Sequence, residues 1–352
     1  MRRIIISLIM LLGFCSGIYP IYFKHIGMQE GLSQLSVMAI YQDQLGRMWF
    51  GTEEGISIYN GVQTIVYKPS EYYRENTNPI GNQTHFIAGD KDGNVFFDSD
   101  NALIRYDIRT QKFSCLQESN VNCITSIQGV IWVGVSDSIF TWNPETEKLD
   151  FAMKLEFSSQ HLTCMKKDSN GQYWIGTTSG LYVKKGDEPL DSVIPGEDIY
   201  CLYEDSRYNL WISIRMNGMY KKDVYGNFTR YRYDPSNPNN ISSNQVRDFT
   251  EDNFGNIWIG TFTGLNKYNP ISGKFEVYAR NPLPGSMTHS SVFPIYKDRQ
   301  GTIWLGTYYG GVNYFNPETD LFTVYTANNA RNDCLNYPFV GKMVEDKDDN
   351  VW

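Results

Sequence analysis

The sequence predicts an all-β protein, a seven-bladed β-propeller whose blades are four-stranded antiparallel sheets. The first observation is a repeat: an aromatic residue, usually Trp, recurs about every 43 residues, a period that fits propeller blades and some helical repeats. The second is the content of each copy. Short β-branched and aromatic runs lie between turn signals without a 3.6-residue period, which indicates strands. The anchors of the repeat are Trp49, Phe96, Trp132, Trp174, Trp211, Trp258, Trp304 and Trp352.

The elements of one blade can be followed in residues 250–273, TEDNFGNIWIGTFTGLNKYNPISG. Asp252 begins an Asp-x-x-Gly turn signal, because Asp accepts backbone N–H groups and Gly supplies a positive φ. Gly264 turns the chain again after the anchor strand, and an Asn-Pro pair separates the third strand from the fourth. The recurring Asp is expected to form turns and the anchor to pack in the core. Asp98 and Ser213 replace the Gly of W-x-G-T, which is expected to matter little because that position is taken to shape a turn.

The two ends of the chain are expected to lie outside the ring of blades. Two arginines precede an unbroken apolar run and then small residues, the layout of a secretory signal peptide, which we assign to residues 1–18. Residues 21–330 form the predicted propeller, and residues 21–26 are expected to pair with the last blade and close the ring. Residues 331–352 open an eighth copy that stops at its own anchor, so we expect a fragment whose next repeats form a second propeller.

Composition and motifs exclude several classes of function. The chain carries 31 basic and 39 acidic residues with no long basic run, so direct contact with nucleic acid is not expected. No hydrolase, Walker A or Rossmann motif occurs and the histidines are scattered, so no catalytic residue, metal or cofactor is predicted. Cys123, Cys164 and Cys201 take nearly matching positions in three inner strands, where Ala39 stands in the first copy. Packing of small side chains is expected there, rather than a metal or redox cluster.

A ligand is expected on the face where the inter-blade connections and the loops between second and third strands open. Binding residues tend to lie on long loops that a rigid scaffold presents. A sugar requires flat aromatic surface together with Arg, Asp or Asn side chains. The alternative is that these residues are solvated loop positions or contacts to a further propeller. The candidate ligand-binding residues are Tyr72, Tyr73, Arg74, Arg215, Arg247, Asp248, Tyr308 and Tyr309.

The opening segment at residues 23–61, FKHIGMQEGLSQLSVMAIYQDQLGRMWFGTEEGISIYNG, resembles the first blade of the two-component regulator propeller family. The recurring D-x-x-G-x-[IL]-W-[IL]-G-T-x-x-G-[IL] is similar to that family's repeat, over nearly the whole chain after the signal peptide. The resemblance implies the periplasmic sensor region of a Bacteroidetes-type hybrid histidine kinase that is anchored in the inner membrane. It further implies an oligosaccharide ligand, control of glycan-utilisation genes, a homodimeric receptor, and a second propeller and kinase regions as partners in the same protein.

Two other functions stay open at this point. A stand-alone secreted propeller could bind a protein or a carbohydrate, or act as a lyase or a glycan-active enzyme. An enzyme would need histidines or carboxylates that converge on the loop face, for which only His85 and His289 are placed suitably. The resemblance favours the sensor, with the kinase chemistry in the parent protein and no catalysis in this region.

Overall fold

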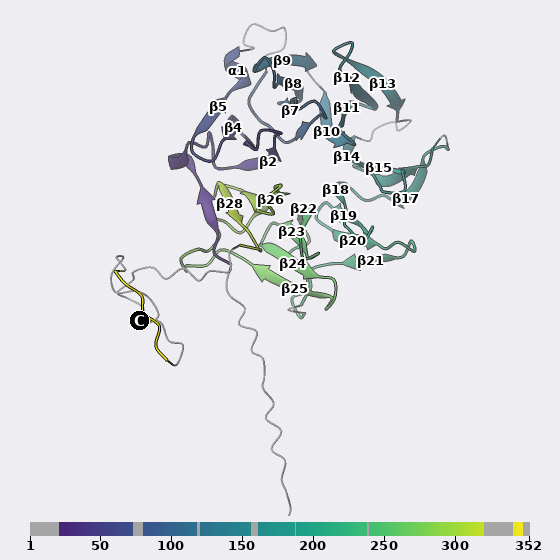
Figure 1. Ribbon diagram of the computed structural model, residues 1–352. Helices are drawn as coiled ribbons and strands as arrows, with labels where there is room; N and C mark the ends of the chain where they lie inside the picture. Colours follow the sequence, from purple (N-terminus) through teal and green to yellow (C-terminus); the bar gives the residue numbers. More distant parts are fainter. Residues whose placement is uncertain are drawn as a thin grey trace, which may run out of the picture. The chain divides into compact units, whose positions relative to one another are not determined.

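The computed structural model describes residues 21–72, 80–117, 120–155, 161–186, 188–237, 239–319 and 341–347. Residues 22–318 form one compact unit of seven four-stranded antiparallel sheets arranged around an axis (Figure 1), which confirms the predicted fold. The described helices are a 3-10 turn, Met28–Glu30, and the single-turn α1, Pro69–Tyr72. Neither is long and apolar enough to cross a membrane. The signal peptide predicted at 1–18 and most of residues 331–352, Trp352 included, lie outside the described residues.

The first strand of each blade is the innermost one, because these strands contact one another around the ring. Blade 1 comprises β2 (Val37–Gln42), β3 (Met48–Thr52), β4 (Gly55–Tyr59) and β5 (Thr64–Tyr67). Blade 2 comprises β6 (Ile87–Gly89), β7 (Val95–Ser99), β8 (Ala102–Asp107) and β9 (Lys112–Gln117). Blade 3 comprises β10 (Val121–Ile127), β11 (Val130–Val135), β12 (Ser138–Asn143) and β13 (Lys148–Lys154).

The remaining blades follow the same order. Blade 4 comprises β14 (Leu162–Lys167), β15 (Tyr173–Thr177), β16 (Gly180–Lys184) and β17 (Asp191–Pro195). Blade 5 comprises β18 (Ile199–Glu204), β19 (Leu210–Ile214), β20 (Gly218–Lys222) and β21 (Phe228–Tyr231). Blade 6 comprises β22 (Val246–Glu251), β23 (Ile257–Thr261), β24 (Leu265–Asn269) and β25 (Lys274–Tyr278). Blade 7 takes β26 (Val292–Lys297), β27 (Ile303–Thr307) and β28 (Val312–Phe315) from the end of the ring and β1 (Lys24–Ile26) from its beginning.

Strand β1 closes the ring. It pairs antiparallel with β28, with Lys24 opposite Tyr314 and Ile26 opposite Val312, as the sequence predicts for residues 21–26. Ile26 is only 3% exposed and packs in a core cluster between the last blade and the first. Among the described residues, the outer position of blade 7 is held by the N-terminal strand.

The turn Asp and the anchor Trp are joined by a hydrogen bond that recurs in five blades; Gly follows the Asp three residues later in four of them, and Tyr208 takes that place in blade 5. The Asp carboxylate accepts backbone N–H bonds from its own turn, which confirms that it is a turn former. Its second oxygen accepts the indole N–H of the anchor six residues later, so a buried polar group finds its partner within the same hairpin. The pairs, at 2.8–2.9 Å, are Trp49–Asp43, Trp174–Asp168, Trp211–Asp205, Trp258–Asp252 and Trp304–Asp298.

The Gly of W-x-G-T does not shape a turn, so that expectation was wrong. Gly176 lies inside strand β15, and a Cβ there would come within 2.5 Å of Cys164 Sγ and 2.8 Å of Ile199 Cγ2 in the next blade. The missing side chain lets neighbouring inner strands pack closely. A residue that replaces this Gly therefore projects toward an inner strand, as Asp98 does in blade 2.

Candidate functional site

One side chain of each blade points toward the axis because the inner strand is irregular at the same place. In blade 1, Val37 pairs with Thr52 and Ala39 with Gly51, so Met38 is left out of the ladder. A β-bulge of this kind re-aims the extra side chain. The same shift occurs in blades 3 to 7, while blade 2 begins β6 only after the matching residues. The resulting set, which we call the axial ring, is Met38, His85, Asn122, Thr163, Tyr200, Arg247 and Phe293.

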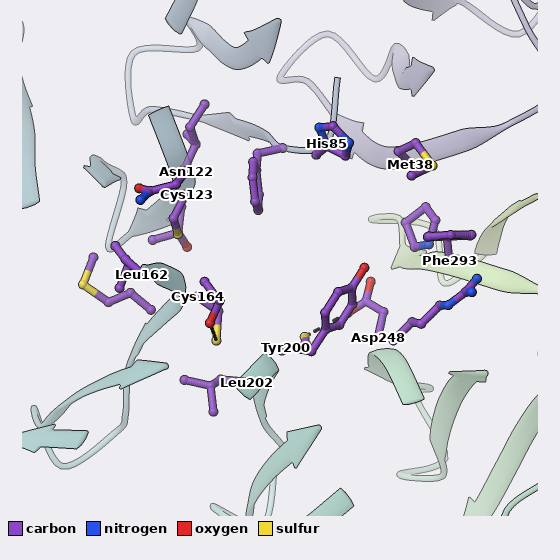
Figure 2. Close-up of a pocket in the computed structure, with 18 of the residues that line it drawn as sticks. Met38, His85, Asn122, Cys123, Leu162, Cys164, Tyr200, Leu202, Asp248 and Phe293 are labelled. Atoms are coloured by element: carbon purple, nitrogen blue, oxygen red, sulfur yellow. Dashed lines mark hydrogen bonds between the residues drawn. The ribbon is translucent and has the colours of Figure 1, made fainter. Parts of the chain in front are cut away.

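The axial ring lines a cavity of about 630 Å³ at the centre of the propeller. Figure 2 shows Met38, His85, Asn122, Tyr200 and Phe293 arranged around its open middle. All seven blades contribute, and Arg215 adds a side chain from the loop between β19 and β20. Aromatic and aliphatic walls with a few converging polar groups are typical of ligand sites.

Arg247 is the most unusual member of the axial ring. The centre of its guanidinium lies 3.6 Å from the ring centroid of Phe293 and 5.3 Å from that of Phe262. Its Nη1 donates a hydrogen bond to Ser291 Oγ at 2.8 Å. Burial lowers the pKa of Arg247, while the phenols of Tyr200 and Tyr308 act in the opposite direction. In the part of the chain that the structure describes, none of the ion pairs includes this guanidinium.

Arg215, in contrast, has a protein counter-ion. Its Nε donates to Asp198 Oδ2 at 2.8 Å, and its guanidinium lies 4.8 Å from the centroid of the Tyr200 ring. Burial raises the pKa of the Tyr200 phenol, and the positive charges of Arg247 and Arg215 lower it by a smaller amount. The phenol consequently stays protonated and can donate a hydrogen bond to a ligand.

His85 is held at the cavity by Asp98, the residue that replaces a Gly in blade 2. Its Nδ1 lies 3.2 Å from Asp98 Oδ2, and Asp98 Oδ1 accepts the backbone N–H groups of His85 and Phe86 at 2.8 and 2.7 Å. The hydrogen bond to Asp98 raises the pKa of His85, against the opposing effect of burial. This replacement, expected to be neutral for the fold, therefore positions a cavity residue.

Behind the axial ring lies a second layer, one residue further along each inner strand. Burial raises the pKa of the Cys164 thiol to about 12 and also raises those of Cys123 and Cys201, so all three stay protonated. No group of three or more His, Cys, Asp or Glu side chains among the described residues could hold a metal ion. The layer consists of Ala39, Phe86, Cys123, Cys164, Cys201, Asp248 and Pro294.

Asp248 is the charged exception in this layer. Its Oδ1 accepts the N–H of Phe249 at 2.8 Å and the thiol of Cys201 at 3.4 Å, and its Oδ2 accepts the N–H of Ile295 at 2.9 Å. Burial nevertheless raises the pKa of Asp248 to about 6. Figure 2 places Asp248 beside Tyr200 at the cavity wall.

Five of the eight residues predicted to bind ligand lie at or next to this cavity. Arg215, Arg247 and Asp248 line it, although the last two belong to strand β22 and not to a loop. Tyr308 lies 5.9 Å from Phe293 by ring centroids and hydrogen-bonds to Tyr309.

The other three predicted residues are not brought to the cavity by the described structure. Tyr72, in α1, packs on Tyr67 beside the outer strand β5 and does not line the cavity. Tyr73 and Arg74 lie outside the described residues. Sequence reasoning missed His85 as a binding residue, as well as Tyr200, Asn122 and Phe293. A signal for them existed, since Met38 and its counterparts precede their anchors by the same interval in nearly every copy.

Comparison with known proteins finds a family model that matches part of the repeat. Five segments match the family described as "Two component regulator propeller", namely residues 31–54, 156–179, 194–215, 240–263 and 286–309. A curated relative, histidine kinase P4 of Formosa agariphila, is 26% identical over 167 residues, which are 42% of this chain and 12% of the kinase. The chain therefore corresponds to a small part of that relative's length.

Solved structures show the same fold. The extracellular domain of a putative hybrid two-component system from B. thetaiotaomicron matches with a TM-score of 0.71 and 24% identity, over 84% of this chain and 42% of that one. Virginiamycin B lyase from Staphylococcus aureus matches with a TM-score of 0.65 and 14% identity, over 84% and 99% of the two chains. Five segments of the chain thus match the two-component regulator propeller family, and the fold is similar to that of the extracellular domain of a putative hybrid two-component system.

Proposed function

We propose that this propeller is the ligand-sensing region of an exported hybrid two-component sensor and that it binds an oligosaccharide in the axial cavity. The observation that carries the proposal is the axial ring itself, one side chain from each of seven blades around a single cavity. Aromatic faces at Tyr200 and Phe293 suit the apolar faces of sugar rings, and the amide of Asn122 suits their hydroxyl groups. The family of the repeats supplies the signalling context.

A sensor must have two states that differ in affinity for the ligand. A molecule that contacts several blades at once binds best to one arrangement of those blades. Its binding can therefore shift the ring toward that arrangement. In the proposed receptor this bias reaches a membrane-anchored kinase through the regions that follow the propeller. Periplasmic location, a homodimeric receptor and control of glycan-utilisation genes belong to the same proposal.

One observation favours a second candidate, a lyase or glycan-active enzyme. The His85–Asp98 pair places an imidazole at the cavity, and a propeller lyase shares the fold. The hydrogen bond to Asp98 orients the imidazole and raises the pKa of His85, which a catalytic His–Asp pair would also show, so this pair by itself does not separate binding from catalysis. The family matched by the repeats is the reason that we favour binding without turnover.

The proposal is tested by screening the purified protein against oligosaccharides released from plant and host glycans, with thermal unfolding as the first measurement and calorimetry as the second. A ligand present at 100 times its Kd stabilises a protein by about 2.7 kcal/mol, which a melting curve resolves. We expect Tyr200→Ala to lose binding and Tyr72→Ala, a matched change at the outer strand, to keep it. Equal binding by both variants would place the site elsewhere, and a change in ligand mass during incubation would favour the enzyme.

A further inference from the structure

We propose that the ligand of the axial cavity carries an anionic group, a carboxylate or a sulfate ester, and that Arg247 binds it. The inference deepens the proposed function, on which it rests for the saccharide nature of the ligand. The anion site itself follows from the charges around the cavity.

The carboxylates near the cavity already have partners of their own. Asp198 is paired with Arg215, and Asp98 with His85. Asp248 receives two backbone N–H groups and a thiol, and burial favours its neutral form. Arg247 is thus a half-buried cation whose charge no described carboxylate neutralises. A desolvated charge is costly unless it is paired, so a counter-ion from outside the chain would be bound favourably.

Arg247 is also held ready for such a partner. Contact with Phe293 on one side and proximity to Phe262 restrict the plane of the guanidinium, and the bond to Ser291 uses one of its donors. A guanidinium has five N–H donors, so a planar edge is left that can bind both oxygens of a carboxylate or a sulfate. Because the side chain is already ordered, little rotamer freedom is lost on binding.

The surrounding groups suit an anion as well. The phenol of Tyr200 is acted on by both Arg247 and Arg215, and it stays protonated as a donor. His85, whose pKa is raised, contributes positive charge from blade 2 when it is protonated. Because Asp198 and Asp98 neutralise Arg215 and a protonated His85, the uncompensated positive charge at the cavity is that of Arg247, in a protein whose net charge is −8. Charge of this sign at one site favours an acidic ligand over a neutral one.

The test compares acidic sugars with neutral counterparts of the same size. The probes are trigalacturonate and its methyl ester, a chondroitin disaccharide with and without its sulfate ester, neutral galactotriose, and citrate as an acid that is not a sugar. The protein is the full chain, as wild type, as Arg247→Met, and as Arg207→Met, a control arginine in the turn before β19 that already contacts Gly255 and Glu251. Calorimetry at low and at physiological salt measures each Kd.

We expect at least one acidic sugar to bind ten or more times tighter than its neutral counterpart, with affinity that falls as salt rises. Arg247→Met should weaken the binding of that acidic sugar at least tenfold and leave the Kd of its neutral counterpart nearly unchanged. Arg207→Met should change neither Kd. The uronate and sulfate arms identify which anion is preferred.

Three outcomes would overturn the inference: equal binding of charged and neutral sugars, unchanged affinity in Arg247→Met, or no binding by any acidic probe. A neutral sugar that binds and is lost in Tyr200→Ala would retain the proposed function while removing the anion site. Binding of citrate alone, dependent on Arg247, would retain the anion site and contradict the saccharide.

Discussion

At the scale of single residues, the position of a carboxylate decides what it does. Asp43 and its counterparts accept hydrogen bonds within their own hairpins, whereas Asp98 reaches out of its strand to hold His85. Asp248 takes a place that other blades fill with Ala, Cys, Phe or Pro, and burial favours its protonated form. One residue type therefore serves as a turn former, as a positioning group and as a buried acid in the same repeat.

The raised pKa of Asp248 predicts a pH dependence of stability. Its pKa rises from 3.8 to about 6 on folding, so the native state prefers the protonated form. The stability that this preference contributes is present below about pH 4 and is lost as the pH rises through about 6. Two pKa units correspond to about 3 kcal/mol. Between pH 4 and pH 7 we expect the free energy of unfolding of Asp248→Ala to improve by roughly that amount relative to wild type.

The measurement is urea unfolding of both proteins across that pH range, with the difference between them taken at each pH. His85, whose pKa is raised too, adds stability that is also lost as the pH rises, but it is present in both proteins and cancels in the difference. Asp223→Ala is the control, because this exposed carboxyl has a lowered pKa and the opposite sign. A difference that does not vary with pH would show that Asp248 titrates normally.

At the scale of elements, the hairpin between the first and second strands is the unit that repeats. Asp252 Oδ1 accepts the N–H groups of Phe254 and Asn256 at 3.0 and 2.8 Å, and Oδ2 accepts the indole N–H of Trp258 at 2.9 Å. One buried carboxylate thus accepts hydrogen bonds from the turn, from the start of the next strand and from the anchor side chain in the core. This explains why Asp and Trp recur together. In blade 2, where Phe96 has no indole N–H, Asp90 Oδ2 keeps the amide of Asn94, a bond that Asn256 also makes to Asp252.

Asp252→Ala is expected to lower the free energy of unfolding by about 2–4 kcal/mol, because buried donors lose their acceptor. Asp223 provides a matched control on the outer hairpin between β20 and β21. It makes the same two backbone bonds, to Tyr225 and Asn227, but has no indole partner and faces solvent. Chemical denaturation should therefore show a much smaller loss for Asp223→Ala. Equal losses would mean that turn geometry alone, and not the buried indole, accounts for the effect.

At the scale of the whole molecule, stability depends on closure of the ring by β1. Blades contact mainly their neighbours, so a break between β1 and β28 would expose the cores of the first and last blades. Ile26 is 3% exposed in that region, while His25 in the same strand is exposed. Although β1 has only three residues, it is therefore expected to contribute strongly to the free energy of unfolding.

Ile26→Ala is expected to cost about 2–4 kcal/mol, since it leaves a cavity between two blades, and to open the closure to protease. His25→Ala should stay within about 0.5 kcal/mol of wild type. Guanidinium unfolding measures the first effect, and limited proteolysis followed by mass spectrometry locates the second. Cleavage within blades 2 to 6 before any cleavage near β1 or β28 would contradict the role assigned to β1.

The sequence by itself determined the repeat, the strands, the number of blades and the closing segment. Each of these features depends on interactions within one hairpin or on the stacking of neighbouring copies. The residues responsible therefore recur at regular intervals in the sequence. The same locality explains the correct prediction that the Asp forms turns and that Trp49, Phe96, Trp174, Trp211, Trp258 and Trp304 are buried in the core.

Only the tertiary structure decided which residues face the axial cavity. A β-bulge turns one side chain from the ladder toward the axis without altering the composition of the strand, so Tyr200 reads as an ordinary strand residue. Arg247 was predicted to bind ligand, but as a loop residue. Phe293 contacts Arg247 only after blades 6 and 7 are packed, and His85, which precedes β6, meets Asp98 in β7. Loop residues such as Tyr72 were predicted because binding residues tend to lie on long loops that a rigid scaffold presents. Here closure of the ring instead brings distant inner strands together at the axis.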